Sequence, residues 1–469
     1  MPPELRASDL EQVRTQLGRE PITSFEVVAR CPVGQHPLVI RNAPFDAVGA
    51  PFPTTFWLTC PDAVRRVSRI ESEGAIAELN RRFDEDVEFH GGVERAHADA
   101  AVERARTDPG AERFGGVGGT RRGIKCLHAH YANRLGGGDD VVGTWVAERV
   151  EPIHPEHLAG RRLAVIDQGT HSCRLLVVER APEDRLIELA QDMVITKLGQ
   201  GVDATGALDP AALARNEAVF ARYCRRARAL GAPDIRVTAT SAVRDATNRD
   251  AFMAIVRAHA GSDPRVIDGS QEARLAFLGG TRGLERGDGP FALLDIGGGS
   301  TELVLGREPG RADDEVSTQM GSVRLTERYV RSDPPSPTEL AAMRTAIDAV
   351  LDGAEAALPA IHMATTLVSV AGTATTLQAI ALGLERYDPE ATHRTWLSLD
   401  GAETALDRLA GMTNPERAAI PVMAPGRGDV IVAGGMILVT VLRRFGFERT
   451  LVSETDILQG LALDGFGVR

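Results

Sequence analysis

The stretch of the chain best suited to chemistry is residues 291–306, FALLDIGGGSTELVLG. An apolar run ends in Asp295, and a second apolar run begins directly after Glu302, so the pattern predicts two short buried strands joined by a turn. The turn contains Gly297, Gly298, Gly299, Ser300 and Thr301. Glycines let backbone N–H groups approach a ligand and tolerate positive φ, and successive N–H groups form an anion-binding concavity. Asp295 and Glu302 could hold a hard cation through oxygen. The segment predicts a phosphate-binding turn flanked by a magnesium-binding pair of carboxylates.

Two other glycine-loop motifs do not fit this stretch. A P-loop needs Gly-Lys-Ser/Thr opening a helix, and no lysine is present here. A dinucleotide-binding fingerprint needs a helix after the glycines, whereas TELVLG alternates like a strand. A plain tight hairpin is the remaining alternative, and an acid on each side of three glycines argues against it.

The same pattern occurs earlier, at residues 163–179, LAVIDQGTHSCRLLVVE. Asp167 aligns with Asp295, and Ser172 aligns with Ser300. The first turn contains Gly169, Thr170, His171 and Ser172. An internal repeat of this kind predicts two related half-domains that face one phosphate chain across a cleft. This arrangement is similar to the superfamily of actin, hexokinase and Hsp70.

Composition limits the classes of protein that fit. The chain has 469 residues, enough for two or three domains. Its net charge of −12 argues against nucleic-acid binding but not against a polyanionic substrate held by local cations or a metal. The first ten residues lack the apolar core of a signal peptide, and no run is long enough to span a membrane. Five cysteines do not indicate a disulfide framework. We expect a cytoplasmic protein that binds neither nucleic acid nor membrane.

Residues 1–150 differ in composition from the rest, with frequent proline and glycine, and predict a separate small α+β domain. Proline-broken strands or loops are expected at 30–40 and 50–61, and helices at 64–80, 94–106 and 124–135. The glycines of residues 114–120 predict a flexible or close-approach loop. A polar, proline-containing linker is expected at 151–161.

A zinc site in this part is one hypothesis. Cys31, Cys60, Cys126, His128 and His130 suggest it, and Cys31, Cys60, Cys126 and His130 are the candidate ligands, because Cys126 and His130 have the i, i+4 spacing of one helix face. The cysteines do not form the paired CxxC knuckles of structural zinc sites. Buried cysteines acting as small hydrophobic residues are the alternative.

Four further residues of the C-terminal two-thirds could take part in phosphate chemistry. Lys197 follows an expected strand, and Arg244 follows the strand expected at 235–239, where open α/β sheets bind ligands. Glu272 lies in the first turn of a helix and could accept a proton from water. Arg324 lies in GSVRLTE and is a candidate phosphate contact. Surface side chains, or an acid favoured by the helix dipole, are the alternatives.

The N-terminal third resembles the domain-of-unknown-function family numbered 501. The resemblance rests on RCPVG at 30–34, PFPTTFWLTCP at 51–61, SRIESEG at 68–74, GGVGG at 115–119 and KCLHAHYA at 125–132. It implies no activity, only that this unit is found near, or fused to, the partner that follows.

The rest of the chain resembles the exopolyphosphatase and guanosine pentaphosphate phosphohydrolase (Ppx/GppA) family. Six motifs occur in the family's order: AVIDQGTHSCRLLV, TSAVRDATN, GSQEARLAFLG, DIGGGSTELVLG, MGSVRLTE and VAGTATTLQAI. The resemblance implies a two-lobed actin-like (ASKHA, ribonuclease H-like) α/β phosphatase that removes terminal phosphate from inorganic polyphosphate. It implies lobes at 162–288 and 289–469 and, by analogy, a homodimer.

The resemblance also implies residue roles. Glu272 would be the general base, Asp295 and Glu302 would bind Mg²⁺ (or Mn²⁺), and Arg244 would be the basic phosphate contact. Asp167 and the two glycine turns would bind phosphate. Four places depart from the family pattern: Gln168, the turn residues Thr170 and His171, the pair Gln271-Glu272 where the family has two acids before Ala-Arg-Leu, and Ala371-Gly372-Thr373 in place of Gly-Gly-Thr. These changes bear on rate and substrate choice more than on the class of reaction.

Other functions remain open at this stage. The motifs do not separate polyphosphate from guanosine pentaphosphate, a stringent-response nucleotide. An actin-like ATP-dependent kinase is a third hypothesis, and the QEARL segment argues against it. A non-catalytic polyphosphate or nucleotide sensor is a fourth hypothesis, against which the presence of Glu272 argues.

Overall fold

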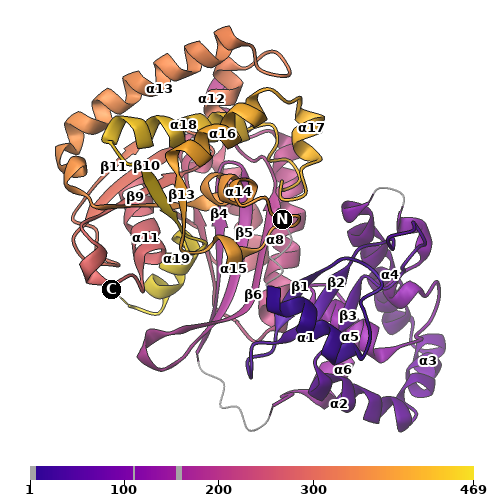
Figure 1. The fold of residues 1–469 in the computed structure, drawn as a ribbon. Coiled ribbons are helices and arrows are strands. Elements are labelled where there is room, and N and C mark those ends of the chain that lie inside the picture. Colours follow the sequence, from indigo (N-terminus) through magenta and orange to yellow (C-terminus); the bar gives the residue numbers. More distant parts are fainter. Residues whose placement is uncertain (1–6, 109–110, 155–160, 469) are drawn as a thin grey trace.

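The computed structural model describes residues 7–108, 111–154 and 161–468. It contains a three-stranded, a five-stranded and a six-stranded sheet. Figure 1 shows the three-stranded sheet and its helices, in indigo and purple, as a separate small unit beside two larger lobes. The α/β fold with a separate small N-terminal domain is thus confirmed. Within these described ranges, no helix is long and apolar enough to cross a membrane.

The N-terminal unit packs its helices around one antiparallel sheet. Its elements are α1 (Ala7–Leu17), β1 (Phe25–Arg30), β2 (Pro37–Asn42), β3 (Phe56–Leu58), α2 (Pro61–Ser72), α3 (Ala75–Glu85), α4 (Val87–Thr107), η1 (Ala111–Phe114), η2 (Val117–Gly119), α5 (Leu127–Leu135) and α6 (Val141–Val150). The single helix predicted at 64–80 is wrong, because Gly74 has φ +94° and separates α2 from α3. The glycine loop at 114–120 is a close-approach loop, since a Cβ on Gly116 would lie 2.4 Å from the Cβ of His97.

The first lobe is built on the five-stranded sheet. Its elements are β4 (Arg162–Gln168), β5 (Ser172–Arg180), η3 (Pro182–Asp184), β6 (Leu186–Ile195), α7 (Val202–Thr205), α8 (Pro210–Ala229), β7 (Ile235–Ala239), α9 (Ser241–Asp245), α10 (Arg249–Ala260), β8 (Arg265–Val266) and α11 (Gly269–Thr281). Helix α8 begins as its sequence predicts. The Asp209 carboxylate accepts hydrogen bonds from the backbone N–H groups of Ala211 and Ala212 at 2.9 and 3.0 Å, and Pro210 is the first helical residue.

The second lobe is built on the six-stranded sheet. Its elements are η4 (Arg286–Asp288), β9 (Phe291–Ile296), β10 (Thr301–Gly306), β11 (Asp314–Thr318), α12 (Ser322–Tyr329), α13 (Pro337–Ala357), η5 (Pro359–Met363), β12 (Thr366–Val370), α14 (Ala371–Ala381), α15 (Pro389–Thr392), β13 (Thr395–Ser398), α16 (Leu399–Ala410), α17 (Asn414–Ala418), α18 (Ile431–Phe445), β14 (Arg449–Val452) and α19 (Ile457–Gly465).

The two large sheets repeat one topology. The strand order is β6-β5-β4-β7-β8 in one lobe and β11-β10-β9-β12-β14 in the other, where β13 adds an edge strand. In both sheets the first three strands are antiparallel and the next two are parallel. This duplication is the two-lobed actin-like architecture that the two glycine hairpins predict.

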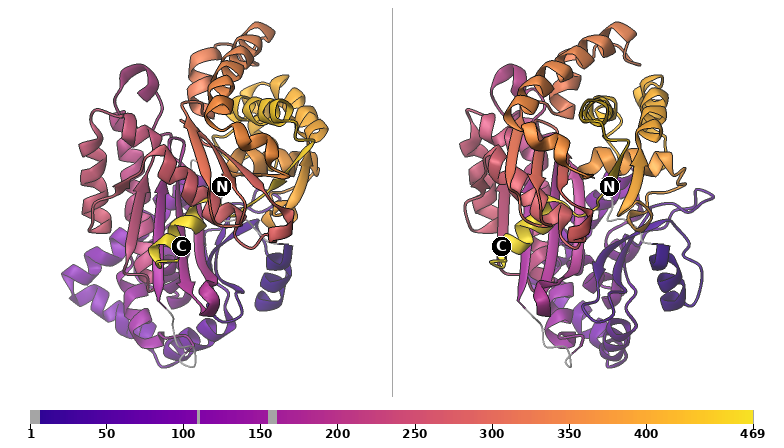
Figure 2. Two further views of the ribbon diagram at one scale, coloured as in Figure 1. Left: turned by 90° about the vertical axis from the view of Figure 1, so that its left-hand side faces the viewer. Right: turned by 60° about the vertical axis from the view of Figure 1, so that its left-hand side comes forward.

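Two helices join the lobes through a shared core. The C-terminal α19 returns to the first lobe and packs on β4 and β5 as well as on α11 (Figure 2). One buried apolar cluster therefore contains Leu163 and Val165 of the first sheet together with Leu293 and Val304 of the second. We propose a boundary between the lobes at residues 288 and 289, based only on the sheet to which each strand belongs. The linker expected at 151–161 falls largely on residues 155–160, outside the described residues.

The N-terminal unit docks on the first lobe along β6 and α8. Buried charges of both units meet there. Arg41 and Arg222 each donate a hydrogen bond to Glu103 Oε1, at 3.0 and 2.7 Å. Asp192 of β6 accepts from Arg226 at 2.8 Å. The docked surface is therefore held by a mixed network of cations and carboxylates.

Candidate functional site

The two glycine turns have the same internal hydrogen bond. Gly169 N–H donates to the carbonyl of Ser172 in the turn between β4 and β5, and Gly297 N–H donates to the carbonyl of Ser300 in the turn between β9 and β10, both at 3.0 Å. These bonds fold each turn and leave the later N–H groups of both turns for a ligand. Both turns line one cavity between the lobes.

The glycines of the second turn are needed for space rather than for backbone torsion. None of the three has positive φ, so the expectation that the turn uses glycines for positive backbone φ angles is wrong. A Cβ on Gly298 would lie 3.1 Å from the Cβ of Thr170, and one on Gly299 would lie 2.5 Å from Ser241 Oγ. Any side chain there would push the lobes apart. The glycines therefore let the two glycine turns lie against each other.

The strand register places opposite charges at equivalent positions of the two hairpins. Asp167 pairs across its hairpin with Arg174, whereas Asp295 pairs across the second hairpin with Glu302. The first hairpin thus carries one carboxylate and one cationic side chain at these positions, and the second carries two carboxylates. Arg174 was missed by the sequence reasoning. The alignment of the two hairpins would have identified it, because Arg174 occupies the position of Glu302.

Glu272 faces this cluster from the first turn of α11. Its side chain is 12% exposed, and Oε2 lies 3.6 Å from Arg244 Nη1 with no hydrogen-bond partner among the described residues. Burial and the neighbouring carboxylates Glu302 and Asp295 raise its pKa well above the ordinary value, against the opposing charge of Arg244. Arg244 itself is held by the carbonyl of Ile267 at 2.8 Å.

The other acids are similarly crowded. Burial, followed by Glu302, raises the pKa of Asp295 well above its ordinary value. Burial also raises the pKa of Asp167, although Arg174 donates to its Oδ2 at 2.7 Å and opposes the rise. Arg174 also pairs with Asp456, which begins α19. The cations near these acids are fewer than the carboxylates they face.

Glu302 is almost completely buried, and its oxygens are held by hydroxyl groups. Ser317 Oγ donates to Oε1 at 2.7 Å, and Ser300 also donates to this side chain. Burial raises the pKa of Glu302 to about 7 despite these bonds. Thr301, next to it, donates to the carbonyl of Met320. The hydroxyls expected to face phosphate are thus partly used to hold the carboxylate and the turn.

A hard divalent cation fits this donor set. The acids of this cluster offer carboxylate oxygens, the ligands that Mg²⁺ prefers. Asp167 Oδ1 and Glu272 Oε2 are buried oxygens without a hydrogen-bond partner in the described part of the chain. The carboxylates raise one another's pKa, as expected where positive charge is lacking. In the described residues, no three of these acids bring ligand oxygens within 4.8 Å of one another.

Not every predicted residue lines the cavity. Those that do are Asp167, Gly169, Thr170, His171, Ser172, Glu272, Asp295, Gly297, Gly298, Gly299 and Ser300. Thr301, Glu302 and Arg244 are not among the residues that line it. Lys197 and Arg324, expected to touch phosphate, lie elsewhere in contacts between the lobes.

Both cations form ion pairs between the two lobes. Lys197 Nζ pairs with Asp429 of the second lobe. Arg324 pairs with Asp245 at 3.0 Å and with Asp203, both in the first lobe, and its Nε donates to the carbonyl of Gly299 at 2.9 Å. Arg324 therefore supports the backbone of the second turn rather than presenting its guanidinium to the cavity.

The departures in the first turn also serve contacts between the lobes. His171 Nε2 lies 3.1 Å from the carbonyl of Gly426. Burial lowers the pKa of His171 to about 4, so this imidazole is neutral at physiological pH. The side chain of Thr170 lies against Gly298 and Gly299. These two residues therefore pack the first turn against the second lobe.

Two charged residues at the far side of the cavity were missed. Arg427 donates to the carbonyl of Gly372 at 2.7 Å and to Thr376 Oγ1 at 2.8 Å. Burial raises the pKa of Glu454 to about 7. Neither residue lies in a glycine turn or a recognisable motif, so the sequence carried no signal for it.

The third turn, at the start of α14, contains a strained residue. Ala371 has φ +64°, a left-handed conformation that costs a residue with a Cβ about 1–2 kcal/mol. We expect Ala371→Gly to raise the free energy of unfolding by about 1 kcal/mol, measured by denaturant titration. Ala374→Gly, inside the same helix, is the matched control and should lower it by about 1 kcal/mol. Equal destabilisation by both changes would contradict the strain argument.

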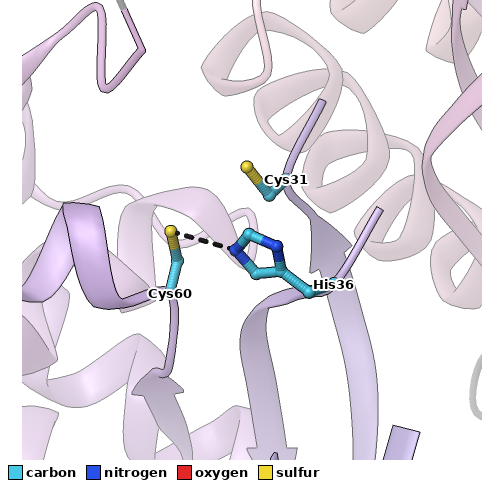
Figure 3. A group of neighbouring side chains, drawn as sticks. All are labelled: Cys31, His36 and Cys60. Carbon is cyan, nitrogen blue, oxygen red and sulfur yellow. Dashed lines mark hydrogen bonds between the residues drawn. The ribbon is translucent and has the colours of Figure 1, made fainter. Parts of the chain in front are cut away.

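The four residues expected as zinc ligands do not come together. Cys31 and Cys60 meet at the end of the N-terminal sheet, together with His36 (Figure 3). Cys60 is hydrogen-bonded to Cys31 and to His36, which lower its pKa to about 3. Of the four expected ligands, the structure brings only Cys31 and Cys60 together among the described residues, and His36 joins them.

The other two candidates lie apart from this cluster. Cys126 precedes α5 in an extended conformation, so the expected i, i+4 helix face with His130 does not exist. Cys126 instead lies with His128 and Glu71. His130 is buried, and its Nδ1 lies 2.9 Å from Asp140 Oδ2.

The fold and this cavity define a two-lobed, actin-like α/β protein with two glycine turns facing one cavity between the lobes. Comparison with known proteins specifies the family. The Ppx/GppA phosphatase family matches residues 176–465, and the chain belongs to this family. The protein family of unknown function DUF501 matches residues 27–148.

Named relatives agree with this assignment. Exopolyphosphatase 2 of Mycobacterium tuberculosis is 39% identical over 318 residues, which cover 65% of this chain and 99% of the relative. A bifunctional 3-dehydroquinate synthase/phosphatase of Fusobacterium nucleatum is 32% identical over 64% of this chain and 46% of its own length. The match thus spans nearly the whole of the first relative and less than half of the second.

Solved structures cover the same two lobes. An exopolyphosphatase-like protein superposes with a TM-score of 0.61 and 33% identity, over 65% of this chain and 98% of that chain. An exopolyphosphatase from Cytophaga hutchinsonii also has a TM-score of 0.61, with 27% identity over 66% of this chain and 99% of that chain.

Proposed function

We propose that this protein is an exopolyphosphatase, which hydrolyses the terminal phosphate of inorganic polyphosphate. The observation that carries the proposal is the position of Glu272. Its carboxylate is largely buried, its Oε2 has no hydrogen-bond partner among the described residues, and it lines the cavity that both glycine turns share. A general base for water needs this combination of access, raised basicity and neighbouring phosphate sites. The relatives named exopolyphosphatase support the choice of substrate.

The turns bind and orient the phosphate chain. Their free N–H groups converge from two lobes, so consecutive phosphates can be held on both sides. Phosphoryl transfer depends chiefly on such positioning and on charge neutralisation. The close packing of Gly298 against Thr170 keeps the two sets of donors in register.

Asp295 and Glu302 would hold Mg²⁺, with Asp167 and Glu272 completing the acidic surroundings. When bound, the cation would neutralise charge on the phosphate oxygens. The shortage of cationic side chains around these acids makes this a natural binding site. Arg174 balances Asp167 and Asp456 and leaves the acids of the second hairpin for the metal.

Glu272 accepts the proton of the attacking water. As the water oxygen bonds to the terminal phosphorus, the bridging P–O bond breaks, and the shortened chain leaves with the bonding electrons. Burial raises the pKa of Glu272 and so its basicity, and the charge of Arg244, 3.6 Å away, opposes this rise.

The test is phosphate release by the purified full chain with Mg²⁺. Long-chain polyphosphate, guanosine pentaphosphate and ATP are offered in parallel. We expect the largest kcat/KM with polyphosphate. A larger value with guanosine pentaphosphate would make the protein a pentaphosphate phosphohydrolase, and binding of polyphosphate without release would make it a sensor; either result would overturn the proposal.

A further inference from the structure

The ends of the three N-terminal strands gather cysteine and histidine side chains, outside the cavity between the lobes. Cys31 follows β1 directly, His36 precedes β2 directly, and Cys60 lies just after β3. One ligand atom from each of the three lies within 4.8 Å of the others. Figure 3 shows the His36 ring directed at Cys60, with Cys31 beside them. His36 Nε2 lies 3.3 Å from Cys60 Sγ. The strand ends on one side of the sheet thus supply two sulfur atoms and an imidazole.

A fourth donor reaches the cluster from outside the sheet. His154 lies after α6, and its Nε2 is 2.9 Å from Cys31 Sγ. Its other ring nitrogen is 3.8 Å from Asp62 Oδ2. Metal-bound histidines characteristically have a carboxylate or carbonyl near the second nitrogen, which fixes the tautomer and the ring orientation.

The backbone around the cluster suits thiolate ligands. The N–H group of Val33 donates to the sulfur of Cys31, and that of Ala63 donates to the sulfur of Cys60. Gly34, with φ +80°, turns the chain between β1 and β2. A Cβ there would lie 3.3 Å from His36 Nδ1, so glycine leaves room for the ring. Cys31 and Cys60 are fully buried free cysteines.

We propose that Cys31, His36, Cys60 and His154 bind one structural Zn²⁺, with Asp62 orienting His154. Two thiolates and two imidazoles are a common tetrahedral zinc set, and all four positions are filled by protein, which is typical of a structural rather than a catalytic site. The softer sulfur donors distinguish it from the all-oxygen magnesium site between the lobes. The inference does not depend on the proposed phosphatase activity.

The position of His154 gives the site a role. His154 is the last described residue before the connection to β4, which begins at Arg162. A metal shared by His154 and the strand ends would tie the start of this connection to the N-terminal sheet. Zinc would therefore stabilise the N-terminal unit and fix where the chain leaves it for the phosphatase lobes.

The cluster of Cys126, His128 and Glu71 is the rival site. Its donors are committed to other contacts: Glu71 accepts from the N–H of Leu127 at 2.6 Å, and His128 Nε2 lies 3.1 Å from Ser68 Oγ. It also has only three donors, and they are more exposed. Cys126→Ser is therefore the matched control for Cys60→Ser.

The experiment measures metal content of the full chain, produced under reducing conditions with zinc supplied. We expect about one zinc per chain in the unmodified protein and in Cys126→Ser. Zinc should fall to background in Cys31→Ser and Cys60→Ser, and His154→Ala should bind it more weakly. Glu272→Gln should keep its zinc, which separates this metal from the magnesium site.

A second measurement does not depend on the folding of variants. Cobalt added to the metal-depleted unmodified chain should give the intense visible bands of tetrahedral Co²⁺ and a thiolate-to-cobalt charge-transfer band. A chain without zinc and without this spectrum would overturn the proposal. So would a Cys31–Cys60 disulfide in freshly purified protein, or loss of zinc in Cys126→Ser but not in Cys60→Ser.

Discussion

Replacement of Glu272 by glutamine should reduce phosphate release from polyphosphate by roughly 10²–10⁴-fold, the usual contribution of general-base catalysis. Glutamine keeps the size of the side chain but cannot take up a proton from water. The phosphate-binding turns are untouched, so polyphosphate should still bind. The expected signature is a fall in kcat with little change in the Kd measured by direct binding.

Glu285→Gln is the matched control, because it makes the same change at an exposed position close to α11. It should leave phosphate release unchanged. The pH dependence is a further readout. The pKa of Glu272 is raised, so kcat/KM should rise with pH as this carboxyl loses its proton, and the glutamine variant should lack that rise. A glutamine variant with normal activity would remove Glu272 from the mechanism.

The two hairpins were predictable because their sequences encode them almost completely. Apolar runs with acids at fixed positions determined strand, turn and strand, and their repetition predicted two lobes. The register that pairs Asp167 with Arg174 follows from the same alignment. Most of the acidic site could therefore be read from residues that are close in sequence.

Contacts between distant segments were not predictable in this way. Lys197 was expected to face phosphate, but its partner Asp429 is 232 positions away in sequence and belongs to the other lobe. From the sequence, a basic side chain near such a turn could equally well contact phosphate or form an ion pair with the other lobe. Only the packing of the lobes determines that Lys197 and Arg324 form ion pairs between them.

The N-terminal cysteines show the same limit. Spacing along the chain suggested Cys126 and His130 as partners, because i, i+4 positions share a face of a helix. The helix begins only at Leu127, and the ligand atoms that do meet come from three strand ends. Sheet pairing brings Cys31 and Cys60 together, and a sequence pattern of period 3.6 carries no information about it.

The largest stability effect is expected from Glu103→Ala, at the junction of the N-terminal unit with the first lobe. Glu103 accepts hydrogen bonds from Arg41, Arg222 and Arg106 at 3.0, 2.7 and 2.9 Å. Burial disfavours its ionised form, but these arginines hold its pKa below the ordinary value. Alanine would leave buried guanidinium groups without their shared carboxylate. We expect a loss of about 3–5 kcal/mol in the free energy of unfolding.

Glu94→Ala is the matched control, since Glu94 is an exposed residue of the same helix, α4, and should change stability by less than about 0.5 kcal/mol. The difference between the two variants should also depend on pH. A carboxyl with a depressed pKa stabilises the fold above its ordinary pKa, and this stabilisation is lost as pH falls through the folded-state value. The penalty of Glu103→Ala should therefore shrink in acid, and equal stability of both variants at neutral pH would show that the network contributes nothing.

The same substitution tests whether the two units are mechanically connected. Arg222 bonds Glu103 and also lies 3.5 Å from Asp192, a residue of β6 that lines the phosphate cavity. Loss of Glu103 should loosen β6 as well as the docked surface. Faster proteolysis between the units together with a raised KM for polyphosphate would mean that the N-terminal unit helps to shape the cavity. Faster proteolysis with an unchanged KM would mean that docking and phosphate binding are independent.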